Sequence, residues 1–291
     1  MDDSLFATVL LPIALAVIMT SLGMSLTLDD FRRVVVYPKG IFIGLANLVV
    51  LSPLLAFGIA ELFELEPAMA VGLVVLGASP GGILANLMTH LARGETALSI
   101  SMTGISSLAA VVTVPLVLTV GVEHFDASGF DEDVEMLSVV PRVLAITVVP
   151  LSIGMWLRAN RERWVEDIGS GFRRVAAVVF AGTVIGVIVA EHERVLENLD
   201  SVAAAAVALN VAAMTISFWV ARLARLDDRQ STAIAMELGV HNTALAIAVA
   251  ATVDTELTIP AAVYASFMFV TAGLFARLMY RRNGPREATA S

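Results

Sequence analysis

The sequence contains no cysteine and only one lysine, and both scarcities exclude classes of protein. Without cysteine the chain cannot form a disulfide framework, a zinc–thiolate site or a thiol nucleophile. The single lysine, Lys39, lies at the edge of an apolar run, so the chain lacks the mid-span lysine that a retinal protein needs. The four histidines do not cluster, and no His-Glu-x-x-His motif occurs. A membrane enzyme such as a metalloprotease is therefore disfavoured.

Charged residues are also few, and acidic ones predominate. They make up 15% of the chain, and the formal net charge is −9, which excludes a nucleic-acid-binding role because a polyanion would be repelled. Hydrophobic residues make up 58% of the chain, with a mean hydropathy of +0.85, whereas soluble domains have an apolar share nearer one half. The opening residues MDDS are acidic, so we expect no secretory signal peptide. The composition predicts a polytopic membrane protein.

Long apolar stretches recur along the whole chain. A membrane-spanning helix needs roughly 20 predominantly apolar residues, and nine stretches meet this requirement: 5–25, 39–61, 68–91, 95–120, 136–157, 173–190, 201–223, 230–251 and 258–280. The connections are short and polar, and none is long enough for a separate soluble domain. We therefore predict an all-α polytopic membrane protein with nine transmembrane helices in a single domain, 1–291.

The basic residues are distributed unequally between the two sides of these spans. Only Arg142 and Arg194 fall on one side, and the remaining sixteen of the 18 fall on the other. Basic loops face the cytoplasm, so we predict a plasma-membrane protein with its N-terminus outside and its C-terminus inside. Most carboxylates lie on the predicted outer side, Asp131, Glu132 and Asp133 among them. Such an acidic exterior would concentrate cations.

Two of the predicted spans contain residues that are unusual in a membrane. The third contains GASPGGILANLMTH (77–90), where Pro80-Gly81-Gly82 should interrupt the helix because proline removes a hydrogen-bond donor and glycine weakens helices. The eighth contains AMELGVHNTALA (235–246). Interrupted segments at corresponding places in two halves indicate a transporter's binding site. Taken alone, the proline-glycine run would equally fit a kink between packed helices, but the polar cluster in the eighth span disfavours that interpretation.

The two interrupted spans indicate an internal repeat. Aligning Asn86 with Asn242 also lays the second and fourth spans roughly over the seventh and ninth. The eighth span comes five spans after the third. Because five is an odd number, the two spans cross the membrane in opposite directions, and the two copies have opposite topology. The sequence thus predicts inverted repeats over about 5–120 and 173–280, connected by the span 136–157.

Among the 27 acidic residues, Glu237 is the only one deep inside a predicted span. No arginine lies in a span interior except Arg142, near an outer end, so a buried Glu237 must be protonated or coordinate a cation. Sodium takes oxygen ligands, as other hard cations do. The candidate oxygen ligands are the Asn86 and Asn242 amides, the Ser99 and Thr103 hydroxyls, and carbonyls freed by the helix breaks.

Two of these candidates have other interpretations. Ser99 and Thr103 are four residues apart and so share a helix face, but their hydroxyls could simply bond to the preceding turn. His241 could be a neutral ligand, a titratable group beside Glu237 or a packed core histidine. Because histidine titrates near neutrality, the second possibility would suit proton coupling, and all three stay open.

The stretches SPGGILANLMTHLARGETALSISMT (79–103) and ELGVHNTALA (237–246) together resemble the bile acid:sodium symporter family. Its members have a proline-glycine-glycine run and an asparagine in one broken helix, and a glutamate-x-glycine-x-glutamine-asparagine run in another. The resemblance covers nearly the whole chain. It implies sodium-coupled symport of an organic anion by alternating access. It also implies a panel domain and a core domain, with the two broken helices crossing at mid-membrane.

The resemblance further implies two sodium sites behind this crossing. The first would use Asn86, Ser99, Thr103 and Glu237, with Ala85 where relatives have a serine. The second would use Glu237, the carbonyls of Leu238 and Val240, the side chain of His241, and Asn47. His241 and Asn47 each stand where the family has a glutamine. Both departures affect the second site, so the resemblance implies one or two sodium ions.

The organic anion would bind where the half-helices begin. Helix N-termini present free N–H groups and a positive dipole end, which suits a carboxylate from a family that transports bile acids, pyruvate-like acids and pantoate-like acids. The expected contacts are Gly81, Gly82, Ile83, Asn242 and Thr243. The only other partner that we expect is the lipid bilayer, and we expect the protein to be a monomer. The alternatives are a proton-coupled carrier of the same fold and an arsenite-efflux-like carrier, which is disfavoured because those carriers rely on a cysteine.

Overall fold

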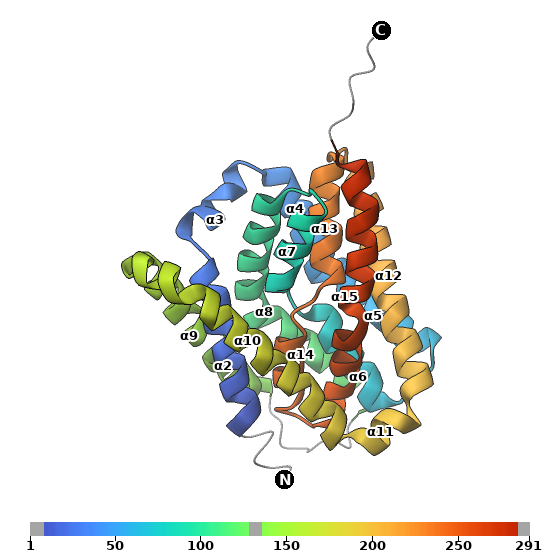
Figure 1. Cartoon of the computed structure of the whole chain (residues 1–291). Helices are drawn as coiled ribbons and strands as arrows, with labels where there is room; N and C mark the ends of the chain where they lie inside the picture. The colour runs from blue at the N-terminus through green and yellow to red at the C-terminus, as the bar shows by residue number, and fades with distance from the viewer. Residues whose placement is uncertain (1–8, 128–135, 285–291) are drawn as a thin grey trace.

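A computed structural model describes residues 9–127 and 136–284, which are almost entirely helical (Figure 1). The elements in chain order are α2 (Leu11–Ser25), α3 (Leu28–Arg32), η2 (Arg33–Val35), α4 (Pro38–Ala46), η3 (Asn47–Leu51), α5 (Ser52–Leu62), α6 (Pro67–Ala78), α7 (Ile83–Leu91), α8 (Thr96–His124), α9 (Met136–Asn160), α10 (Glu162–Ala190), α11 (His192–Glu197), α12 (Leu199–Leu223), α13 (Asp228–Gly239), α14 (Thr243–Ala250), η4 (Glu256–Thr258) and α15 (Ile259–Arg282). Asp131, Glu132, Asp133 and the side chain of Arg142 lie outside the described residues.

Five helices of the described chain are long and apolar enough to cross a membrane: Pro38–Leu62, Thr96–His124, Glu162–Ala190, Leu199–Leu223 and Glu256–Arg282. A sixth is added if Leu11–Ser25 and Leu28–Val35, bent by 71°, form one broken span. These helices overlap apolar stretches identified in the sequence, and they agree with a multi-pass membrane protein. The remaining expected spans correspond to shorter or interrupted helices, so the count of nine stays a prediction.

The first long span contains a wide turn at its centre. Between α4 and α5, the residues Asn47–Leu51 form a π-helical turn. Pro53 follows directly and lacks the N–H that an α-helix would bond to the carbonyl four residues earlier. Such a turn re-aims the side chains of a helix without ending it, and Asn47 is its first residue.

Both expected helix breaks are present. The first separates α6 from α7 at 79–82, and the second separates α13 from α14 at 240–242. All residues of α14 are buried, as are those of α6 from Ala68 onward and of α13 from Ser231 onward. A helix that is buried on all sides lies in the core of the protein. The breaks therefore lie among other helices, where neighbours can satisfy the freed backbone groups.

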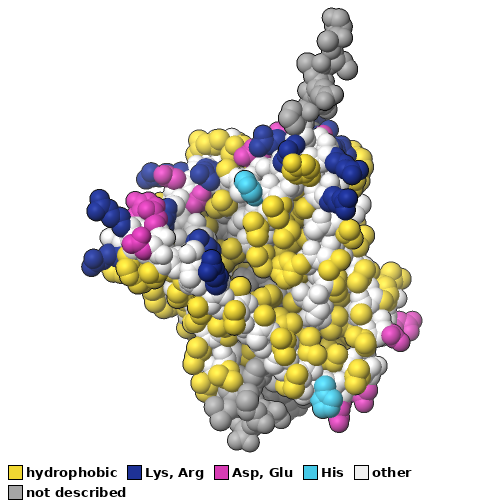
Figure 2. Space-filling model, in the orientation of Figure 1, with side chains coloured by type: hydrophobic (Ala, Val, Ile, Leu, Met, Phe, Trp, Pro, Cys, Tyr) yellow, Lys and Arg dark blue, Asp and Glu magenta, His cyan; other side chains and the backbone are white. Residues whose placement is uncertain are grey.

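The surface separates an apolar band from charged ends. Hydrophobic side chains cover the middle of the face in Figure 2, Lys and Arg gather in its upper part, and Asp, Glu and His appear at the lower end. The described chain begins at the lower end with α2, and α15 ends at the upper end (Figure 1). An odd number of spans requires termini at opposite ends. The direction in which the protein is inserted stays a prediction.

Candidate functional site

The two helix breaks contact each other and form the centre of the candidate site. The Gly82 amide donates to the Val240 carbonyl at 2.8 Å, and the Asn242 amide donates to the Pro80 carbonyl at 2.8 Å. Gly81 and His241 thus face each other in an isolated antiparallel bridge. A broken helix leaves backbone groups without partners, and here each break supplies partners for the other.

Gly81 allows this close approach. A Cβ atom built there would clash with Oε2 of Glu237 and lie 2.7 Å from its Cδ. The glycine therefore brings the first break directly against the only carboxylate that the sequence places deep in a span. Gly239 has a similar role at the end of α13, because a Cβ there would clash with the side chain of Met214.

Glu237 is fully buried and accepts hydrogen bonds from α8. Ser99 Oγ donates to Oε1 at 2.6 Å. Thr103 Oγ1 lies 2.8 Å from Oε1 and 3.0 Å from Oε2. In the described part of the chain, no lysine or arginine forms an ion pair with Glu237. Among the described residues this carboxyl contacts hydroxyl groups and no arginine, which agrees with the expectation that Glu237 is protonated or coordinates a cation.

The oxygens around Thr103 outnumber the hydrogens between them. Thr103 Oγ1 lies within hydrogen-bonding distance of both Glu237 oxygens, of Asn86 Oδ1 at 3.3 Å and of the Ser99 carbonyl at 3.1 Å. One hydroxyl hydrogen can serve only one or two of these four acceptors. Oxygen groups that converge without enough hydrogens are the ligand type that a hard cation prefers. The four side chains predicted for the first sodium site are thus brought together.

His241 lies on the other side of the crossing. Its ring is buried, with Nδ1 3.0 Å from the Ser79 carbonyl and Nε2 3.3 Å from Ser52 Oγ. A carbonyl oxygen only accepts hydrogen bonds, so Nδ1 carries a hydrogen and Nε2 faces the Ser52 hydroxyl. No hydrogen bond or ion pair joins His241 to Glu237 within the described ranges. The ring connects the second break to α5 and to the end of α6.

The remaining residues predicted for the second sodium site are less well assembled. The Val240 carbonyl already accepts from the Gly82 amide, and Leu238 lies in the last turn of α13. Asn47 is buried, and its Nδ2 atom has no hydrogen-bond partner among the described residues. No hydrogen bond of the described chain links Asn47 to Glu237 or His241.

The residues predicted to contact the anion surround the two half-helix starts. Gly81, Gly82, Asn242 and Thr243 are buried, and Ile83 is half-buried. The Asn242 side chain caps α14 by accepting from the Leu245 amide at 3.1 Å, and the Thr243 hydroxyl is buried without a partner in the described chain. An unpaired buried hydroxyl costs free energy, so Thr243 has unused capacity to bind a polar ligand.

Three further residues support the site, and sequence reasoning missed them. Asn210 Nδ2 donates to the Gly239 carbonyl at 2.8 Å, and the Tyr264 hydroxyl donates to the same carbonyl at 3.0 Å. These side chains come from α12 and α15 and satisfy the end of α13. Ser52, on α5, contacts His241. The signal was available for Asn210, because it stands alone in the apolar run SVAAAAVALNVAAM (201–214) and a polar residue inside a membrane needs a partner.

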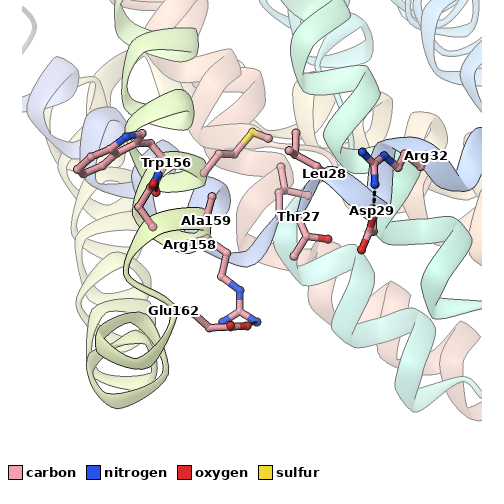
Figure 3. Close-up of a pocket in the computed structure, with 11 residues that line it drawn as sticks. Thr27, Leu28, Asp29, Arg32, Trp156, Arg158, Ala159 and Glu162 are labelled. Carbon is pink, nitrogen blue, oxygen red and sulfur yellow. Dashed lines mark hydrogen bonds and ion pairs between the residues drawn. The ribbon is translucent and has the colours of Figure 1, made fainter.

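A cavity of about 480 Å³ lies elsewhere, where the bend between α2 and α3 faces the junction of α9 and α10 (Figure 3). Its charged groups are already paired, Arg32 with Asp29 at 3.2 Å and Arg158 with Glu162 at 3.4 Å. None of the predicted site residues lines it. The oxygen cluster at Glu237 is therefore separate from this cavity.

Comparison with known proteins adds independent information. The model of the Sodium Bile acid symporter family matches residues 12–199. The chain is 28% identical over 282 residues to an uncharacterized sodium-dependent transporter, YocS, of Bacillus subtilis, covering 95% of this chain and 84% of that protein. It is 27% identical over 280 residues to the probable chloroplastic sodium/metabolite cotransporter BASS1 of Arabidopsis thaliana, covering 94% and 67%. It is 28% identical over 245 residues to the ileal sodium/bile acid cotransporter of Oryctolagus cuniculus, covering 83% and 69%.

Proposed function

The chain belongs to the sodium bile acid symporter family, and from this membership we propose that it carries a small organic anion across the membrane together with sodium. The family consists of membrane transporters and not of enzymes. The finer features proposed below are the ion site, the anion site and alternating access between two sides of the membrane.

The observation that carries the proposal is the hydrogen-poor oxygen cluster at Glu237. Its oxygens come from three helices, with Asn86 on α7, Thr103 on α8 and Glu237 on α13. A sodium ion bound there would offset the buried carboxylate and replace hydrogen bonds that one threonine hydrogen cannot supply. The ion would thereby hold both broken helices to α8.

The anion is proposed to bind at the half-helix starts, on the face where Gly82 and Thr243 lie. Both residues begin or precede a helix N-terminus, where N–H groups and the helix dipole favour a negative charge. The substrate's charge would also be attracted by the cation held behind the crossing. Sodium would therefore strengthen anion binding, and the anion would strengthen sodium binding by the same factor.

Alternating access requires two bodies that move relative to each other. Among the described elements, α2 packs against α9 and α10, and the broken helices pack against α8, α12 and α15. This grouping supports the panel and core domains implied by the family. With nine spans arranged as inverted repeats, rocking of one body against the other would open the site to each side in turn.

A thermal-stability screen of carboxylates, with sodium and with potassium at equal ionic strength, tests this function. We expect one class of organic anion to stabilise the purified protein only when sodium is present. That anion should then enter proteoliposomes against its gradient when sodium is high outside. Uptake driven equally by a proton gradient without sodium would instead support the proton-coupled alternative, and stabilisation that ignores sodium would contradict coupling.

A further inference from the structure

A second cavity, of about 440 Å³, lies between α7 and α15 near the end of α15 that carries the basic residues. Its walls include Met88 and Leu91 of α7, and Ala276, Arg277, Tyr280 and Arg281 of α15. None of the residues assigned to the ion or the anion lines it. We call it the α7–α15 groove.

The groove carries positive charge that is not paired with any carboxylate of residues 9–127 and 136–284. Arg277 and Arg281 are exposed and stand one helical turn apart, so they share a face of α15. Neither forms an ion pair within the described chain. By contrast, the neighbouring Arg222 and Arg282 share Asp228, at 3.3 and 3.0 Å. Lys and Arg side chains gather over the upper end of α15 in Figure 2.

A third cation is fixed at the rim of the groove. The Arg93 guanidinium lies 3.8 Å from the ring centroid of Tyr280 and donates to the Tyr280 hydroxyl at 2.6 Å. Its backbone has φ = 55°, a left-handed conformation that is unfavourable for a bulky residue. Asn283 holds the same turn, because its Nδ2 donates to the Ala92 carbonyl at 3.0 Å. The turn between α7 and α8 is thus tied to the end of α15.

Beside and before these arginines, α15 exposes large apolar side chains. Val270, Leu274 and Leu278 expose 64, 66 and 62% of their surface, which fits contact with lipid in a multi-pass membrane protein. Gly273 also lines the groove, and a Cβ atom built there would meet no atom within 4 Å. The groove therefore changes within about two helical turns from an apolar surface with free space to a pair of arginines.

We propose that the α7–α15 groove binds an anionic phospholipid, with the phosphate between Arg277 and Arg281 and an acyl chain along Gly273. Basic pockets between transmembrane helices, at the end where the hydrocarbon layer stops, suit such headgroups. The 480 Å³ cavity lacks this charge complementarity, since its arginines are paired with carboxylates. The lipid would connect α15 to α7, the helix that carries Asn86.

The experiment compares lipids bound to the full-length protein by native mass spectrometry in a neutral detergent. Phosphatidylglycerol should be retained in preference to phosphatidylcholine. Arg277→Gln/Arg281→Gln should weaken phosphatidylglycerol binding about tenfold. Gly273→Leu, which fills the apolar part and leaves the charges in place, should weaken it as well. The control Arg161→Gln/Arg163→Gln removes the same charge from α10 and its preceding turn and should bind like wild type.

The cooperative thermal unfolding of each variant, measured without sodium or substrate, reports whether it is folded and keeps this test independent of the proposed transport function. Equal phosphatidylglycerol retention by folded Arg277→Gln/Arg281→Gln would overturn the proposal. So would equal retention of phosphatidylcholine by wild type, since the charge would then have no role. Displacement of the lipid by inorganic phosphate at similar concentration would identify a site for free anions and would also overturn it.

Discussion

At the scale of single residues, the Thr103 hydroxyl decides what the oxygen cluster can bind. It contacts Glu237, Asn86 and the Ser99 carbonyl, and it has one hydrogen for all of them. If the Glu237 carboxyl were ionised and no cation were bound, some of these oxygens would face each other with no hydrogen between them. With a cation, the same lone pairs become ligands. The convergence of oxygen lone pairs, which is unfavourable around an ionised and empty cluster, therefore becomes favourable when a cation is bound.

Replacing Thr103 by valine tests this residue, because the shape is kept and the oxygen is lost. We expect the apparent sodium affinity, measured by sodium-dependent thermal stabilisation, to fall about tenfold or more, since a contact to a charged group is removed. Thr183→Val is the matched control, because that hydroxyl bonds only to the Val179 carbonyl of its own helix. Unchanged affinity in Thr103→Val would exclude Thr103 as a ligand.

Gly81→Ala tests the contact between the first break and the carboxylate. The new methyl group would clash with Glu237 Oε2, so either Glu237 or the break must move. We expect a loss of about 1 to 3 kcal/mol in stability together with weaker sodium binding, both read from thermal unfolding. Gly182→Ala, where a Cβ meets nothing within 4 Å inside α10, should leave sodium binding unchanged and raise stability by up to about 1 kcal/mol, because alanine favours a helix more than glycine does. A Gly81→Ala protein that behaves like this control would show that the close approach is not needed.

At the scale of elements, the crossing depends on side chains that come from other helices. His241 connects the break between α13 and α14 to Ser79, after α6, and to Ser52 of α5. Asn210 and Tyr264 satisfy the last carbonyl of α13. Both breaks are thus held by side chains that are not part of the oxygen cluster at Glu237.

His241→Gln introduces the glutamine that the family resemblance implies at this position of the second proposed sodium site. In the wild type, the Nε2 lone pair faces Ser52, and nitrogen is a poorer ligand than oxygen for a hard cation. We therefore expect a sodium Hill coefficient near one in the wild type and a higher one in His241→Gln. Uptake measured between about pH 5.5 and 8.5 tests this. Equal, pH-independent coefficients near two in both proteins would exclude a special role for this histidine.

The start of α14 supplies the test of the anion site. Thr243→Trp adds bulk beside a buried hydroxyl that has no partner in the described chain. We expect it to abolish stabilisation by the carboxylate identified in the screen and to leave stabilisation by sodium largely intact. Substrate that still protects Thr243→Trp from heating would place the anion site elsewhere.

The sequence predicted both breaks. Pro80 cannot donate a backbone hydrogen bond, and the polar residues inside the eighth span indicated an interrupted helix at a binding site. It also predicted that Asn86, Ser99, Thr103 and Glu237 belong together, through the family resemblance. It did not predict the pairing of Gly82 with Val240, nor the contacts of Ser52, Asn210 and Tyr264. These depend on which helices pack side by side. The spacing of residues along the chain does not reveal which helices pack together.

At the scale of the whole molecule, an apolar band surrounds a polar centre. The exposed faces of the long helices are hydrophobic, and buried polar side chains, Ser99, Thr103 and Glu237 among them, lie where the broken helices meet. Water is absent from a bilayer core, so polar groups placed there must bind one another or a ligand. The fold therefore isolates the oxygen cluster from lipid.

The most direct test of this account is equilibrium binding of radioactive sodium to the purified protein and to Glu237→Gln. The substitution keeps the size of the side chain and removes the charge on which the proposed ion site depends. Glu61→Gln, which changes an exposed carboxylate on α5, is the control. The account predicts saturable sodium binding by the wild type and by Glu61→Gln, and none by a folded, membrane-inserted Glu237→Gln. Undiminished sodium binding by Glu237→Gln would contradict it.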